Sequence, residues 1–117
     1  MGILVTAAGD VLARARRDGA AGSVWQVPDE RRELDANVIH LPAGDRLSAP
    51  AGTDLDVLLV VLDGAGKLAS AEGTVPVSAG SVVWMPRGTP RTVVAGPDGL
   101  SYFSVHRRRP PMTIGRA

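Results

Sequence analysis

The chain has 117 residues, no cysteine, and 13 basic against 12 acidic side chains, for a formal net charge of +1. This length fits one domain with a real core, and the missing thiols exclude disulfides, cysteine nucleophiles and thiolate metal sites. The balanced charge gives no field that would concentrate nucleic acid, and no window reaches the length of a membrane span, so we expect neither as a partner.

The N-terminal part contains the one helix that we expect. Asp10 is placed to cap a helix over residues 11–17, and Gly19 is placed to end it. The apolar residues 1–5 follow no basic region, so no secretory signal is visible and we expect a cytoplasmic protein. Alternation over residues 23–27 then predicts the first strand.

From Leu34 onward the chain consists of short apolar segments separated by glycine or proline, which is typical of an all-β sandwich or small barrel. Residues 55–64 form the densest apolar run, and we expect a central strand covered on both faces. Residues 67–70 and 74–77 read as a hairpin, and Pro76 in its second arm favours an edge strand. The other predicted strands are residues 37–41, 46–49, 81–85, 91–95 and 100–106.

Two groups of residues stand at fixed spacing on either side of this hairpin. Gly44 and Gly64 enclose the first group, and Gly80, Pro86 and Gly88 form the second. Their spacing resembles the two sequence motifs of the cupin family of small jelly-roll barrels. The resemblance covers residues 44–95, about half of the chain, and implies an all-β, cupin-type jelly-roll β-barrel. Together with the strands predicted on either side, we expect this barrel over residues 23–109, after an N-terminal extension with a short helix (residues 1–22) and before a C-terminal tail (residues 110–117).

The positions at which the cupin family places its metal ligands hold Pro50, Gly52, Val57 and Arg91. None of these side chains has a lone pair suited to a divalent ion, and a guanidinium is a permanent cation. The resemblance therefore carries over the scaffold and not the metal-dependent reactions of many cupins. We expect neither a metal nor a cofactor.

Arg91 replaces the histidine of the second motif, so the resemblance implies that its side chain points into the barrel. Val57 and Leu59 share a strand face that we take as interior. A buried guanidinium needs an acceptor, either within the protein (Asp54, Asp56 or a backbone carbonyl) or from a carboxylate or phosphate ligand. The predicted ligand pocket consists of Arg91, Pro50, Gly52, Val57, Leu59 and Trp84.

The two histidines, His40 and His106, would form a metal site only together with a carboxylate such as Asp35 or Asp45. An ordinary hydrogen bond at a strand end is the simpler interpretation of each. Tyr102, Ser104 and His106 alternate onto one face of the last strand. Some metal-free cupins are sugar epimerases with a histidine base and a tyrosine acid, and Tyr102 with His106 or His40 would supply those residue types.

These patterns favour a metal-free, cupin-like domain that binds a small molecule, such as an organic acid, or acts as a dimeric assembly module without catalysis. A metal-independent isomerase or epimerase and a regulatory protein-interaction domain remain as alternatives. We also expect a homodimer, because a small barrel with exposed strand edges and so dense an apolar run gains by pairing.

Overall fold

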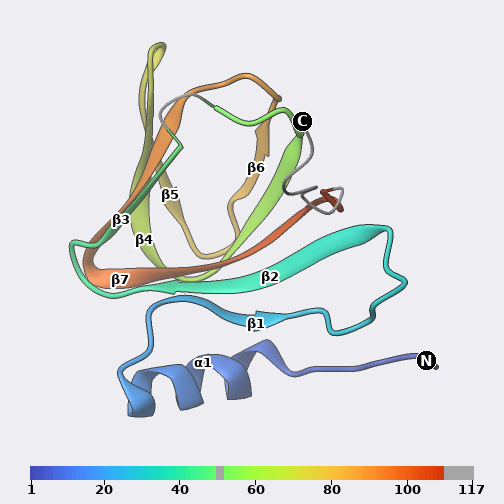
Figure 1. Ribbon diagram of the computed structural model, residues 1–117. Helices are drawn as coiled ribbons and strands as arrows, with labels where there is room; N and C mark the ends of the chain where they lie inside the picture. Colours follow the sequence, from blue (N-terminus) through green and yellow to red (C-terminus); the bar gives the residue numbers. More distant parts are fainter. Residues whose placement is uncertain (50–51, 110–117) are drawn as a thin grey trace, which may run out of the picture.

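The computed structural model describes residues 1–49 and 52–109 (Figure 1). Pro50, one of the predicted pocket residues, lies outside this part. The one helix and seven antiparallel strands found in the described residues confirm the all-β class. In chain order the elements are α1 (Ala8–Asp18), β1 (Gly22–Gln26), β2 (Leu34–Leu41), β3 (Arg46–Ala49), β4 (Val57–Ser70), β5 (Gly73–Ser78), β6 (Val82–Met85) and β7 (Arg91–Arg107).

Two long strands, β4 and β7, hold the barrel together, because they pair with each other along most of their length. The first half of β4 also pairs with β6 and its second half with β5. The second half of β7 pairs with β2, which in turn pairs with β1, and its first half pairs with β3. The resulting sheet curls around a common interior (Figure 1).

The bend of these two strands depends on glycines. A Cβ at Gly64 would lie 2.2 Å from the carbonyl oxygen of Gly99, and one at Gly66 would lie 2.2 Å from that of Val94. The β4–β7 ladder shifts register twice here, between Val61 and Asp63 and between Gly64 and Gly66. The backbones of β4 and β7 thus approach too closely for any side chain, and Gly64 also has a φ of 78°.

This bend corrects two strand boundaries. Residues 91–95 and 100–106 belong to one strand, β7, and the two apolar segments at 55–64 and 67–70 largely merge into β4. Glycine often marks the end of a strand. Here the glycines bend β4 and β7, and the two strands continue to pair beyond the bend.

The interior is apolar, and Leu59, Val61, Leu100 and Tyr102 are each at most 2% exposed. The prediction that the central strand is covered on both faces is wrong. Residues of β4 alternate between buried and more exposed, and Leu58 on the outer face is 41% exposed.

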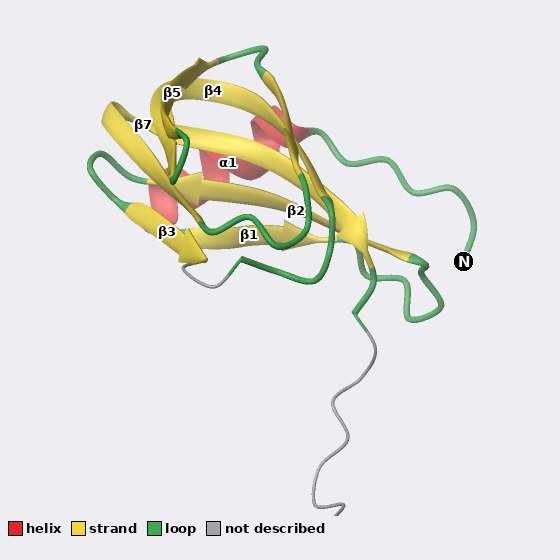
Figure 2. Cartoon of the chain, turned by 90° about the horizontal axis from the view of Figure 1, so that it is seen from above, coloured by secondary structure: helices red, strands yellow, loops and turns green. Residues whose placement is uncertain are grey.

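Helix α1 packs on the outer face of β1 and β2 (Figure 2) and buries Leu12 and Ala15. It begins before the predicted cap: the N-cap is Ala7, which makes no side-chain hydrogen bond, and Asp10 lies in the first turn, where its charge favours the helix dipole. Gly19 ends the helix as predicted, with a φ of 65°. Within the described residues no helix is long and apolar enough to cross a membrane.

Candidate functional site

A cavity of about 260 Å³ lies between the curled halves of the sheet, lined by residues of β2, β3, β4, β6 and β7. Its walls are mostly apolar, and Val57 and Leu59 form part of them. The polar side chains that line it are Ser48, Arg91, Tyr102, Ser104, His106 and Arg109.

The register of β7 explains how three of these side chains meet the cavity. Tyr102, Ser104 and His106 follow one another on the interior face of the strand. Their cross-strand neighbours on β4 are Val61 for Tyr102, Leu59 for Ser104 and Val57 for His106. The interior face therefore becomes more polar from the buried Tyr102 toward the end of the strand.

Arg91 contributes a half-buried cation to this cavity. Its Nη1 donates to the carbonyl oxygen of Thr89 at 3.3 Å. The ion pairs formed within residues 1–49 and 52–109 join other residues, so no carboxylate there neutralises Arg91. Burial lowers the pKa of its guanidinium, which shows that the charge is partly desolvated.

Neither of the aspartates suggested by the sequence binds Arg91. Asp56 accepts a hydrogen bond from the backbone nitrogen of Arg87 at 2.9 Å and so stabilises the turn after β6. Within the described residues Asp54 forms no ion pair. Of the internal acceptors that we considered, a backbone carbonyl is the one that the structure provides.

Tyr102 supplies a neutral donor beside Arg91. Its burial raises the pKa of the phenol to about 12, with a smaller opposing effect of the Arg91 charge. The hydroxyl has no hydrogen-bond partner among the described residues, where every fully buried side-chain nitrogen or oxygen is paired. Because Tyr102 lines the cavity and its phenol keeps its proton at neutral pH, the hydroxyl is a donor that a ligand there could use.

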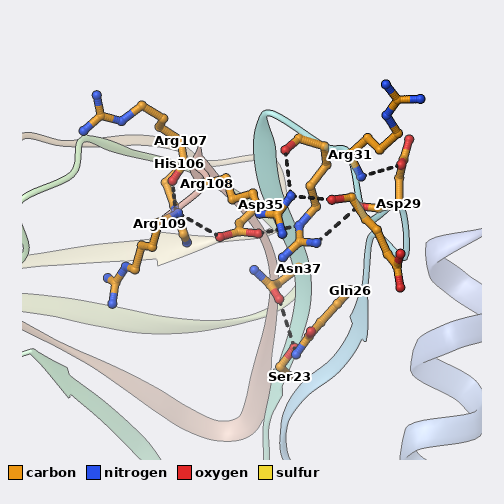
Figure 3. A network of polar contacts seen from close by, with 12 residues as sticks. Ser23, Gln26, Asp29, Arg31, Asp35, Asn37, His106, Arg107, Arg108 and Arg109 are labelled. Carbon is orange, nitrogen blue, oxygen red and sulfur yellow. Dashed lines mark hydrogen bonds and ion pairs between the residues drawn. The ribbon is translucent and has the colours of Figure 1, made fainter. Parts of the chain in front are cut away.

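The cavity reaches the surface near the exposed Arg109, and a polar network lies beside this mouth (Figure 3). Asp35 accepts from Arg32 Nε at 2.7 Å and from the backbone nitrogen of Arg109 at 3.4 Å, and the Arg32 hydrogen bond lowers the pKa of the Asp35 carboxyl. The Asp35 carboxylate thus holds the backbone of Arg109, whose side chain extends away from it and lines the cavity.

His106 lies at the same mouth. Its Nδ1 is 2.8 Å from the carbonyl oxygen of Arg107. Because a carbonyl oxygen only accepts, Nδ1 carries the hydrogen and Nε2 of the neutral ring is left as an acceptor.

His40 lies on the opposite face of the sheet, beneath α1. Its Nδ1 is 2.8 Å from Ser101 Oγ, and the residue is 8% exposed. A metal site shared by His40 and His106 is therefore ruled out by strand alternation. The described residues also contain no group of three His, Cys, Asp or Glu side chains placed to hold a metal ion.

We expect His40 to make folding stability depend on pH. Burial lowers the pKa of His40 below its ordinary 6.5, with a further effect of the Arg16 charge. Below pH 6.5 the His40 side chain therefore binds a proton more readily in the unfolded chain than in the folded one. The free energy of unfolding is not reduced by this protonation above pH 6.5, and it falls as the pH drops below that value. Thermal melts from pH 7.5 to 5.0 should show this loss, and His40→Gln should flatten it. An equally steep loss in the variant would contradict this role.

The described ligand positions of the cupin motif do not fit a metal. Val57 and Arg91 line the cavity without offering a lone pair to a cation. Gly52 has a φ of 72°, and a Cβ there would lie 2.8 Å from the backbone carbon of Gly88, so this glycine allows two loops to approach each other. The donor set present does not match a divalent transition metal.

Three residues separate the observed lining from the predicted pocket: Gly52 and Trp84 do not line the cavity, and Arg109 does. Trp84 points out of the barrel and is 61% exposed. Arg109 was missed because strand alternation from His106 would place Arg108 inside instead. The strand ends at Arg107, and the chain turns there, so no periodic signal marks Arg109.

Comparison with curated proteins finds no match. Among solved structures, a protein of unknown function from Rhizobium leguminosarum superposes with a TM-score of 0.67 at 20% identity, covering 93% of this chain and 100% of the other. A Cupin 2 conserved barrel domain protein from Salinispora arenicola gives 0.63 at 20%, covering 76% and 75%.

A sugar phosphate isomerase of the cupin superfamily from Silicibacter pomeroyi gives a TM-score of 0.61 at 22% identity, over 68% of this chain. The chain spans about half of that protein, 53% of its length. At these identities the likeness shows the fold, and it confirms the cupin-type jelly roll.

The family described as the AraC-like ligand binding domain matches residues 35–109, from the start of β2 to the arginine at the cavity mouth. The matched segment contains both long strands and the residues that line the cavity. Because this match spans more than half of the chain, the protein belongs to the AraC-like ligand-binding domain family, and its barrel is a cupin barrel.

Proposed function

We propose that the domain binds a small organic anion inside the barrel, without a metal and without catalysis. The observation that carries this proposal is Arg91, a half-buried cation that lines the cavity and meets no carboxylate within the described residues. A desolvated guanidinium gains from a charged acceptor, and carboxylates and phosphates match its geometry.

Two neighbours add to the attraction. The protonated Tyr102 hydroxyl and the Arg109 side chain line the same cavity, so donors and positive charge converge on one small volume. The family description, a ligand-binding domain, supports a binding role. A phenol with a pKa of about 12 is a poor partner for proton transfer at neutral pH, which argues against the isomerase alternative.

Arg91→Ala should abolish the thermal stabilisation that small organic acids such as acetate and succinate give to the parent protein. A ligand at about 100 times its dissociation constant stabilises the folded state by roughly 2.7 kcal/mol, so the shift is measurable by differential scanning fluorimetry. We expect the variant without ligand to melt close to the parent, because Arg91 makes one hydrogen bond to a backbone carbonyl.

The exposed Arg87 offers a matched control, since Arg87→Ala removes one positive charge outside the cavity. Arg87→Ala should keep the full response to the acids. If instead Arg91→Ala melts much lower and no anion stabilises the parent, Arg91 has a structural role and the proposed function is wrong.

We also propose that the domain forms a homodimer through the outer face of the sheet. Two cross-strand rows there are apolar from β2 to β6, and exposure rises along them to 69% at Val82 and 61% at Trp84. The rows are Val38–Phe103–Val60–Val82 and Ala36–Val105–Leu58–Trp84. Helix α1 covers the end at β1 and β2, so the other end is left to a second copy.

Light scattering at tens of micromolar protein should give the mass of a dimer, and Trp84→Lys should shift it toward the monomer. Val5, which is 87% exposed in the segment before α1 and belongs to neither row, allows Val5→Lys as a control that should remain dimeric. A monomeric parent at this concentration would refute the dimer.

A further inference from the structure

The barrel is open along one side. Strands β5 and β6 both pair with β4, along its second and first halves respectively, and no ladder among the described strands joins β5 to β6. Val75 reveals the consequence. It shares a strand face with the buried Val77, yet it is 59% exposed. An apolar side chain of the interior face therefore borders solvent between β5 and β6.

A groove of about 570 Å³ occupies this open side. It is larger than the 260 Å³ cavity and lies within the range of about 300–1,000 Å³ that small-molecule sites occupy. Side chains from three strands make its walls apolar: Leu68 of β4, Val75 and Val77 of β5, and Val82, Val83, Trp84 and Met85 of β6. Val82 and Trp84 border both this groove and the outer face proposed for the dimer.

Arg91 connects the groove with the cavity, because Arg91 and Met85 line both. Arg91 pairs in the ladder with Ser70, at the end of β4 that leads into the β4–β5 turn. The same turn carries Glu72, an exposed carboxylate that also lines the groove. Glu72 lies at the same end of the groove as Arg91, but its exposed carboxylate is screened by solvent, so the half-buried Arg91 determines where a negatively charged group binds.

We propose that the ligand is an amphipathic monocarboxylate, with its carboxylate on Arg91 and its apolar body in the groove between β5 and β6. This inference rests on the proposed function and adds the ligand class. The cavity alone has room for a short acid, whereas the adjoining groove removes an apolar chain or ring from water.

Calorimetric titration with 4-phenylbutyrate, acetate and 4-phenylbutanol tests the ligand class on the whole chain. The parent should bind 4-phenylbutyrate about tenfold or more tightly than acetate, because several carbon atoms enter the apolar groove. The alcohol should bind more weakly than the acid, since it brings no charge to Arg91.

Val75→Asp places a second carboxylate on the groove wall at an exposed position, where folding should tolerate it. It should lower the affinity for 4-phenylbutyrate about tenfold and change that for acetate little. Thr74→Asp is the matched control, because Thr74 neighbours Val75 on β5 and lies outside the groove lining. It should leave both affinities unchanged.

The outcomes separate the two proposals. Equal affinities for acetate and 4-phenylbutyrate, or an unaffected Val75→Asp variant, would overturn the groove assignment. Binding of the alcohol as tight as that of the acid would overturn the placement of the carboxylate on Arg91. Acetate binding that depends on Arg91 would then still support the anion cavity. If neither acid binds to the parent, the anion cavity and the groove assignment both fall.

Discussion

Gly64→Ala should destabilise the domain by about 4 kcal/mol or more, a large part of the roughly 5–15 kcal/mol that stabilises a small domain. The new methyl group would lie 2.2 Å from the carbonyl oxygen of Gly99, so the backbones of β4 and β7 would have to separate. Gly64 also has a φ of 78°, which an L residue adopts at a cost of about 1–2 kcal/mol. Urea denaturation followed by tryptophan fluorescence would measure the loss.

Gly44→Ala separates these two contributions. Gly44 has nearly the same φ, 77°, but a Cβ at this position would have no atom within 4 Å. It should lose about 1–2 kcal/mol, the cost of the left-handed backbone alone. If the two variants lose the same free energy of unfolding, the close approach of β4 and β7 is not what requires glycine at position 64.

Leu100→Ala is the second change with a large expected effect, about 2–5 kcal/mol. Leu100 is 1% exposed and pairs with Leu41 on one side and Gly64 on the other, so its side chain fills the corner where the long strands bend. The rigid backbone around this corner cannot collapse into the space left by the deletion. Thermal unfolding should show a melting temperature lowered by about 10–20 °C.

Leu34→Ala provides the comparison, because Leu34 lies on β2 and is 55% exposed. It should change stability by less than about 1 kcal/mol. A comparable loss in both variants would mean that the cavity term at Leu100 is small.

Much of the architecture follows from local signals in the sequence. Glycine and proline act on the backbone within a few residues, so the turns after Leu41, Ser70 and Met85 are placed correctly. The spacing of Gly64 and Gly80 predicted the scaffold as well, since these residues bracket the hairpin of β4 and β5.

The side-chain directions were harder to predict because the bends change the strand parity. On β7, Arg91 and Val93 line the cavity before the bend, and Tyr102 and Ser104 line it after the bend. The cavity is thus lined by odd-numbered residues of β7 before the bend and by even-numbered residues after it. The alternation of inward and outward side chains, counted along the sequence, is therefore interrupted between Val94 and Leu100. The position of Arg91 came from the motif spacing instead.

Burial of the central strand was over-predicted for a different reason. The apolar run from Leu55 to Leu62 fits a strand covered on both faces, but α1 reaches only part of the outer face. Leu58 and Trp84 therefore pair with each other in an apolar row that is exposed in the single chain. A sequence pattern does not distinguish cover by the same chain from cover by a second copy.

The last strand, β7, pairs with β2 and β4, which are synthesised well before it, and this order affects how the domain folds. Leu41 of β2 pairs with Leu100, and Val57 of β4 pairs with His106, so both contacts join distant parts of the chain. Such contacts close long loops before they contribute stability, and proteins rich in them fold in milliseconds to seconds. During synthesis, at about 5–20 residues per second, β2 and β4 leave the ribosome seconds before their common partner. The apolar faces of β2 and β4 therefore stay uncovered until β7 has been synthesised, and we expect the barrel to form late, in one cooperative step.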